Sequence, residues 1–219
     1  MASQESYPPV FQHLKPSLAD MVTPVCEEYL GGLGVMLHKA LTPEECKAII
    51  DASEKLGYQA AKDYCYMYNN RRNDRFMSDD PELAAFLWKR VKQFAPKQLK
   101  AFDRNWEVDD LNIRFRFCKY IGGQGHHFGP HLDGTYSVDQ DHMSLLTCMF
   151  YLNGTDEFEG GRTNFIQMKT KKLNYSVKPE PGLCVIFRQM DTRCYHEGTE
   201  VTKGLKYIMR TDIMYHAVD

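Results

Sequence analysis

The change in hydrophobic period near Leu111 constrains the fold more than any other feature of this 219-residue chain. From that point, short runs rich in β-forming residues alternate with Gly, Pro, Asn and Asp, a pattern typical of antiparallel strands joined by turns. We predict strands over residues 111–121, 145–152, 163–167, 173–177, 183–188, 193–197 and 205–215.

The segment before Leu111 has helical spacing instead. At residues 42–45 (Thr-Pro-Glu-Glu), Thr42 suits an N-cap, Pro43 the first helical position and Glu45 a capping box, and the helix should run to about Leu56. A second helix should begin at residues 80–82 (Asp-Pro-Glu), with an apolar stripe of Leu83, Phe86, Leu87, Val91 and Phe94. Helices followed by many antiparallel strands predict an α+β fold: a jelly-roll core with supporting N-terminal helices.

The length and the 43% hydrophobic content fit one domain with one substantial core. Residues 1–25 contain four prolines without clear periodicity, so we expect a poorly ordered N-terminal arm with little chemistry of its own. Residues 26–219 should then form a single domain.

The formal charge of −2 gives no electrostatic reason to expect a nucleic-acid or membrane partner. No apolar stretch approaches the roughly 20 residues needed to span a bilayer, and the first residues lack the pattern of a secretory signal. We therefore expect an intracellular protein, cytoplasmic or nuclear. The seven cysteines include no C-x-x-C pair, which favours reduced thiols over a disulfide framework. Nothing in the sequence indicates an oligomeric state.

A histidine and a carboxylate two positions apart, His131 and Asp133, are the strongest chemical signal. Residues i and i+2 of a strand share a face, so both side chains can point inward while Leu132 points away. With His196 from a later strand they would form a set of two histidines and one carboxylate, which is typical of non-haem Fe(II) sites. Such a site leaves coordination positions open.

The other histidines compete for this role, and His126 and His127 are the nearest to His131. Neither has a carboxylate two positions later, so we assign them at most a role beside the metal or toward substrate. The remaining competitors are His13, His38, His142, His216 and, among carboxylates, Asp191.

A cation is the second requirement, because open iron positions alone would not select one acidic cosubstrate over other chelators. Lys206 and Arg210 follow His196 on one predicted strand, and alternation places both on the same face as Ile208. Either cation could point at the iron, so both remain candidates. Arg114 and Arg116 could serve substrate or cosubstrate, or pair with acidic neighbours.

Together these residues resemble the prolyl-4-hydroxylase-like branch of the Fe(II)/2-oxoglutarate-dependent dioxygenases, from about Leu37 to Tyr215. The likeness rests on several short segments in the right order: RFCKY (116–120), GGQG (122–125), FGPHLDG (128–134), FYLN (150–153), EGGRTNF (159–165), PG (181–182), VIF (185–187), HEG (196–198) and GLKY (204–207).

The resemblance implies a double-stranded β-helix in which His131, Asp133 and His196 bind Fe(II). It also implies that Lys206, Arg210, Tyr120 and Thr163 are the candidates for holding 2-oxoglutarate. The implied reaction consumes O2, converts 2-oxoglutarate to succinate and CO2, and hydroxylates a C–H bond; ascorbate is a further cofactor that such a reaction could use. Arg210 and the unusual terminal strand put a peptidyl proline in doubt as the substrate, so another peptidyl residue or a small molecule stays open.

Two other classes of function remain. One is a jelly-roll sensor or scaffold that binds metal or 2-oxoglutarate without turnover. The other is a cupin-like metalloenzyme with no cosubstrate, in which His126 or His127 is an additional ligand. The polar run 64–75 is the candidate lid over the mouth of the barrel, where Tyr, Asn and Arg side chains suit a peptide or polar ligand.

Overall fold

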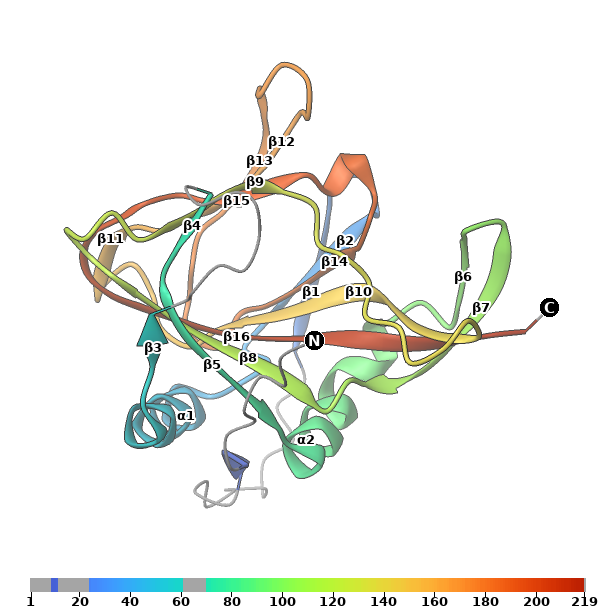
Figure 1. Cartoon of the computed structure of the whole chain (residues 1–219), viewed down its shortest axis with the longest axis horizontal. Coiled ribbons are helices and arrows are strands. Elements are labelled where there is room, and N and C mark those ends of the chain that lie inside the picture. The colour runs from blue at the N-terminus through green and yellow to red at the C-terminus, as the bar shows by residue number, and fades with distance from the viewer. Residues whose placement is uncertain (1–8, 12–23, 61–69, 219) are drawn as a thin grey trace.

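The computed structural model describes residues 9–11, 24–60 and 70–218, which fold into two facing β-sheets supported on one side by two α-helices (Figure 1). The helices are α1 (Pro43–Leu56) and α2 (Pro81–Val91), which continues into a short 3-10 turn, Lys92–Phe94. The strands are β1 (Val25–Tyr29), β2 (Gly34–His38), β3 (Gln59–Ala60), β4 (Arg71–Arg72), β5 (Asp74–Asp79), β6 (Gln98–Ala101), β7 (Arg104–Leu111), β8 (Arg114–Ile121), β9 (His127–His131), β10 (His142–Tyr151), β11 (Phe158–Gly160), β12 (Thr163–Ile166), β13 (Leu173–Val177), β14 (Cys184–Arg188), β15 (His196–Gly198) and β16 (Val201–Ala217).

The larger sheet has the order β1-β2-β14-β10-β16-β8-β5-β3, and β6, β7 and β11 join it off this path. The smaller sheet has the order β13-β12-β15-β9-β4. All of the pairings described are antiparallel, including those of the long central strand β16 with β7, β8, β10 and β11. This arrangement is the double-stranded β-helix predicted from the sequence, with its helices on the N-terminal side.

Alternation along the central strands divides the interior into two cores. On β16, Tyr207 and Met209 pack toward the helices, whereas Ile208 faces the space between the sheets. On β8, Phe117 lies on the helix side and Tyr120 on the inter-sheet side. Side chains of a strand alternate between faces. The same strands therefore direct every second side chain into the space between the sheets and the others into the helix-side core.

Both predicted helices are confirmed, and their caps explain where they begin. The side chain of Thr42 accepts a hydrogen bond from Glu45 N, and the Glu45 carboxylate accepts one from Thr42 N, which is the predicted capping box. Asp80 caps α2 in the same way through Leu83 N. The helices present apolar faces to the large sheet, and Leu83 and Leu87 are fully buried there.

All seven predicted strand regions contain strands, with end shifts, but several others were not predicted. The missed strands include the exposed β1 and the charged β7, both with weak alternation, and β9, which contains Gly129 and Pro130. These strands gain their structure from pairing with neighbours rather than from their own sequence preference. The end of β9 at His131 affects the site, because Asp133 then lies just beyond the strand rather than within it.

Part of the expected N-terminal arm belongs to the packed structure. Val10 is fully buried in the helix-side core, and Phe11 N donates a hydrogen bond to the Asp80 carboxylate. Apolar contact accounts for this, because Phe11 also packs on the ring of Phe86. The rest of the expected arm that precedes β1, residues 1–8 and 12–23, lies outside the described residues, and so does the first part of the candidate lid, 64–69.

No helix in the described part of the chain is long and apolar enough to cross a membrane. The cysteines that the structure describes are all free, and all but Cys26 are buried. The nearest pair is Cys148 and Cys184, whose sulfur atoms lie 3.5 Å apart, a contact distance and not a bond. Their burial agrees with the prediction of reduced thiols that act as small apolar side chains.

Candidate functional site

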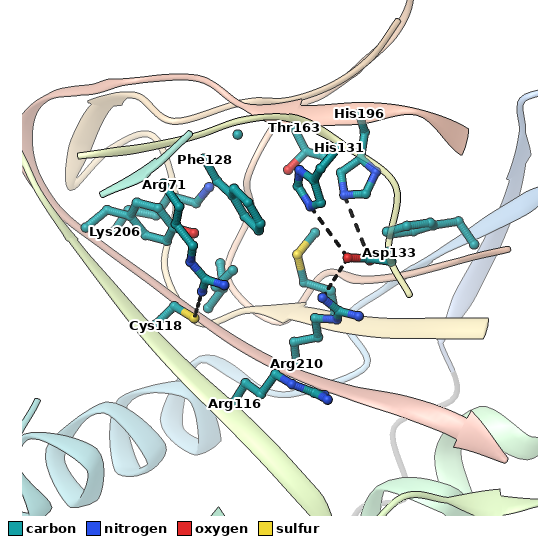
Figure 2. Close-up of a pocket in the computed structure, with 15 residues that line it drawn as sticks. Arg71, Arg116, Cys118, Phe128, His131, Asp133, Thr163, His196, Lys206 and Arg210 are labelled. Carbon is teal, nitrogen blue, oxygen red and sulfur yellow. Dashed lines mark hydrogen bonds and ion pairs between the residues drawn. The ribbon is translucent and has the colours of Figure 1, made fainter. Parts of the chain in front are cut away.

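The three side chains singled out by sequence converge between the two sheets. His131 is the last residue of β9, His196 is the first residue of β15, and the two are paired across these neighbouring strands of the small sheet. Asp133 follows β9 and points toward both (Figure 2). One ligating atom from each of the three lies within 4.8 Å of the others. Among the described residues, no other group of three or more His, Cys, Asp or Glu side chains meets this test.

The two imidazoles are oriented by the backbone. The Nδ1 atoms of His131 and His196 each lie 2.8 Å from a carbonyl oxygen two residues earlier, that of Gly129 and that of Cys194 respectively. A carbonyl can only accept, so each Nδ1 carries a hydrogen, and Nε2 is the ring nitrogen that can bind a metal. Burial also lowers the pKa of His196 to about 4, which keeps that ring neutral. Both rings are thus prepared to donate Nε2 to a metal.

Asp133 is held in its ionised form. Burial alone would raise its pKa, but the Arg210 guanidinium and the two histidines hold the pKa well below its usual range. Arg210 donates to Oδ1 at 2.7 Å, and Thr147 donates its hydroxyl proton to Oδ2 at 2.7 Å. The carboxylate therefore has one fixed orientation, and it is the only acidic side chain among the described residues that line this pocket.

A network of charged groups stands behind Arg210. Asp212 accepts from Arg210 at 3.3 Å, from Arg116 at 2.8 Å and from the amide of Gln189 at 2.9 Å. Arg116 and Arg210 thus both bind the buried carboxylate of Asp212, and Arg210 also binds that of Asp133. This network fixes Arg210 next to the candidate metal ligands and away from the other end of the pocket.

That other end contains Lys206, four positions earlier on the same face of β16. Its side chain is buried, and its amino group donates to the carbonyl of Gly161 at 2.7 Å. The ammonium lies 5.0 Å from the ring centre of Tyr120 and 5.4 Å from that of Tyr151. Burial lowers the pKa of Lys206 to about 8. No carboxylate in the described part of the chain pairs with it.

Thr163 and Tyr120, two of the candidates for holding 2-oxoglutarate, also line this pocket. Thr163, at the start of β12, accepts a hydrogen bond from the Tyr151 hydroxyl at 2.5 Å, which leaves its own proton free to donate. The combination of a buried cation with hydroxyl groups is suited to a carboxylate. The pocket therefore has a candidate metal centre at one end and an anion-binding end at the other.

The remaining sequence candidates lie elsewhere. His126 accepts a hydrogen bond from Ile121 N and closes the loop after β8, and neither it nor His127 lines the pocket. The other described competitors bind acidic or basic neighbours at the surface: His38 with Glu27, His142 and His216 with Asp109, and Asp191 with Arg193. Arg114 forms a paired contact with Asp79 and does not line the pocket.

Sequence reasoning missed several residues of this site. Thr147 and Asp212 fix Asp133 and Arg210, and alternation along their strands could have placed them on the inner face. Phe128 stacks on the His131 ring, with the ring centres 3.6 Å apart. The guanidinium of Arg71 lies over the Phe128 ring, 4.4 Å from its centre. Arg71 belongs to the candidate lid run 64–75, but its contact with Phe128 depends on the pairing of β4 with β9, which no local signal in the sequence indicates.

Comparison with known protein families gives a match to the model of the 2OG-Fe(II) oxygenase superfamily over residues 115–212, the segment that contains all three candidate metal ligands and both β16 cations. Comparison with curated proteins gives no match.

Three solved structures illustrate the similarity in fold. A viral collagen prolyl hydroxylase of Paramecium Bursaria Chlorella virus-1, solved as its 2-oxoglutarate complex, matches with a TM-score of 0.59 at 21% identity, over 85% of this chain and 97% of that one. A Pseudomonas putida prolyl-4-hydroxylase matches with a TM-score of 0.54 at 16% identity, over 83% and 91%. A Trichoplax adhaerens prolyl hydroxylase, in complex with a hypoxia inducible factor peptide fragment, matches with a TM-score of 0.55 at 14% identity, over 83% of each chain.

Proposed function

We propose that the chain is a member of the 2OG-Fe(II) oxygenase superfamily and hydroxylates a C–H bond of a peptidyl residue, with His131, Asp133 and His196 as its iron ligands. It is an Fe(II)- and 2-oxoglutarate-dependent dioxygenase that uses O2 and releases succinate and CO2. The observation that carries the assignment of ligands is the convergence of two imidazoles and one carboxylate, with one ligand atom of each within 4.8 Å of the others.

The residues present fit Fe(II). Each Nδ1 is bound to a carbonyl, so Nε2 is the nitrogen that each imidazole can offer to the metal, and Asp133 is ionised. Two imidazoles and one carboxylate are the donor set of non-haem Fe(II) oxygenases, which leave positions open for cosubstrate and O2. When bound, Fe(II) supplies the coordination of 2-oxoglutarate and the reduction of O2 that this chemistry requires.

We assign the distal carboxylate of 2-oxoglutarate to Lys206, supported by Thr163 and Tyr120. Lys206 is a buried cation whose carbonyl contact leaves its charge uncompensated, and binding a carboxylate would offset the cost of burying that charge. Arg210 is a poorer candidate, because its guanidinium already binds Asp133 and Asp212.

Arg210 instead acts as a positioning residue for the metal ligand. Its hydrogen bond to Oδ1, together with that of Thr147 to Oδ2, fixes the plane of the Asp133 carboxylate before metal binds. Ligands that are held in place in this way lose less conformational entropy on binding.

A peptide is the substrate class that the comparisons favour. The Trichoplax enzyme with a similar fold was solved in complex with a hypoxia inducible factor peptide fragment, and here the edge strand β4 contributes Arg71 to the pocket wall. Edge strands offer unpaired backbone groups to an extended chain. Within the described residues, the inter-sheet pocket is thus reached from a side that can accept a segment of polypeptide.

The test is succinate formation from 2-oxoglutarate by purified protein with Fe(II), first without substrate and then with candidate peptides. We expect slow succinate formation by the native protein and its loss, to below about one hundredth, in His131→Ala, Asp133→Ala and His196→Ala. His127→Ala is the matched control, since this histidine lies on the same strand but outside the pocket. If the triad variants retained native rates, the assignment of the ligands would be wrong. A native protein that binds 2-oxoglutarate without ever forming succinate would instead be a sensor or scaffold.

A further inference from the structure

The walls of the pocket carry more positive charge than its negative groups balance. Four cationic side chains line it, Arg71, Arg116, Lys206 and Arg210, against the single carboxylate of Asp133. Asp212, just behind, adds one more. Since uncompensated charge is costly in a partly buried pocket, each cation needs a partner in the working enzyme.

Three of the four cations are accounted for. Arg116 and Arg210 share Asp212, and Arg210 also binds Asp133. Lys206 receives the distal carboxylate of 2-oxoglutarate in the proposed function. Fe(II) and the two negative charges of 2-oxoglutarate cancel in net charge, so binding of both leaves the surplus positive charge of the pocket unchanged. Arg71 is the cation that has no carboxylate contact within the described residues.

Arg71 is nonetheless held firmly in the pocket wall. Its Nε donates to the buried side chain of Asn73 at 2.7 Å, and one terminal nitrogen donates to the Cys118 sulfur at 3.2 Å. Its guanidinium lies over the Phe128 ring, which in turn stacks on the ring of His131 (Figure 2). No carboxylate among the described residues contacts it, and the contacts that it does make are all with uncharged groups.

This arrangement is that of a binding group rather than of a solvated surface arginine. An arginine with no role in the pocket would extend its charge into water. Here the neighbouring Arg72 does lie exposed, while Arg71 is turned inward, and a planar guanidinium fixed by stacking loses little further freedom when it binds a carboxylate through two hydrogen bonds. The single phenylalanine ring between Arg71 and His131 places this group close to the candidate metal centre.

Building on the proposed function, we propose that the substrate carries a carboxylate which Arg71 binds beside the iron site. In a peptide this group is an Asp or Glu side chain close to the residue that is hydroxylated. A neutral peptide would leave Arg71 uncompensated in the complex, so the pocket selects acidic over neutral sequences. The same guanidinium could in principle meet a carboxylate of 2-oxoglutarate, and the experiment separates these two sources.

The test uses pools of capped tetrapeptides in which every member carries one Asp or Glu, with matched pools in which Asn or Gln replaces it. The peptides are added to protein loaded with 2-oxoglutarate and Mn(II) to measure the shift in melting temperature, and with Fe(II) to measure succinate formation above the basal rate. We expect the acidic pools to act at concentrations at least about tenfold lower than the amide pools, the difference that one charge-assisted contact provides.

Arg71→Gln should abolish this difference, Arg71→Lys should retain part of it, and Arg72→Gln, the exposed neighbour on the same strand, should behave as the native protein. The KM for 2-oxoglutarate should stay within about twofold in all three, and the basal succinate rate should stay within about twofold in Arg72→Gln. Acidic and amide pools that act alike on the native protein, whether both are active or both silent, would overturn the proposal.

A rise in the KM for 2-oxoglutarate in Arg71→Gln, with the peptide preference intact, would assign Arg71 to the cosubstrate and also overturn it. The basal reaction separates this failure from that of the proposed function. If the native protein forms succinate and the peptide preference is absent, only the carboxylate inference fails; if no succinate forms at all, the proposed function fails first.

Discussion

At the scale of single residues, the two cations of β16 show how position on one strand face determines role. Lys206 and Arg210 are four residues apart and point the same way, yet Lys206 contacts only a carbonyl while Arg210 contacts two carboxylates. The sequence predicts their shared face from alternation. It cannot predict which one is already neutralised, because the partners Asp133 and Asp212 reach Arg210 only through the fold.

Replacing Lys206 tests that distinction. We expect Lys206→Ala to raise the KM for 2-oxoglutarate by about 10- to 100-fold, since hydrogen bonds to a charged group contribute about 1.5–3 kcal/mol. Arg210→Gln should instead lower kcat with a much smaller change in that KM, because the substitution removes a hydrogen bond to the metal ligand Asp133 and no contact with the cosubstrate. Steady-state kinetics at varied 2-oxoglutarate measures both. An unchanged KM in Lys206→Ala with a large rise in Arg210→Gln would exchange the two roles.

The same lysine predicts a pH dependence. Its pKa is lowered by burial to about 8, so the fraction that carries the proton falls as pH rises through that value. Affinity for the 2-oxoglutarate dianion should fall with it, and we expect the KM for 2-oxoglutarate to rise between pH 7 and pH 9. In Lys206→Arg the guanidinium stays charged over this range, so its KM should be flat. A flat profile in the native protein would show that Lys206 does not bind the cosubstrate.

At the scale of elements, the helices were predictable and the edge strands were not. Thr42 and Asp80 mark the starts of their helices by N-cap hydrogen bonds that form between residues close in sequence and need no tertiary contact. Strands such as β4 and β9 have no such signal: β4 has two residues, and β9 contains glycine and proline. Their pairing is nevertheless what places Arg71 and His131 in one pocket, so the position of Arg71 beside the metal site could not be predicted from the sequence.

One buried ion pair links α1 to α2. Both terminal nitrogens of Arg90 bind the Glu45 carboxylate at 2.7 Å, and Arg90 also donates to the carbonyl of Ala40 at 2.9 Å. Arg90 is only 5% exposed, so its removal leaves a largely buried carboxylate without its partner. We expect Arg90→Ala to lower the free energy of unfolding by about 3–5 kcal/mol.

Urea unfolding followed by circular dichroism measures this change. Lys47→Ala is the control, since it removes an ion pair with Asp51 that is exposed to solvent, and its unfolding midpoint should stay close to that of the native protein. A loss in Arg90→Ala no larger than that in Lys47→Ala would show that the buried pair does not hold the two helices together.

At the scale of the whole molecule, the two sheets form one body whose cavity is lined from both sides. The triad comes from β9, β15 and the segment after β9, whereas both β16 cations come from the large sheet. A ligand that contacts both ends must therefore link the two sheets. The fold could be predicted from the sequence because the order and spacing of its motifs resemble a known family. The charge network around Asp212 could not, because it depends on side-chain packing that no sequence motif indicates.

Ligands should accordingly stabilise the whole molecule. A ligand that binds only the folded state adds about 2.7 kcal/mol at one hundred times its dissociation constant. We expect Mn(II) with 2-oxoglutarate to raise the melting temperature of the native protein by several degrees and of His127→Ala equally, and to have little effect on His131→Ala. Equal stabilisation of His131→Ala would place the ligands elsewhere.

The measurement that tests the central claim most directly is a calorimetric titration of the anaerobic protein with Fe(II). Three side chains, His131, Asp133 and His196, form the candidate site, and their ligand atoms lie within 4.8 Å of one another. We predict one Fe(II) bound per chain, its loss in each of the three single alanine variants, and its retention in His127→Ala. Stoichiometric Fe(II) binding that survives removal of His196 and of Asp133 would contradict the account.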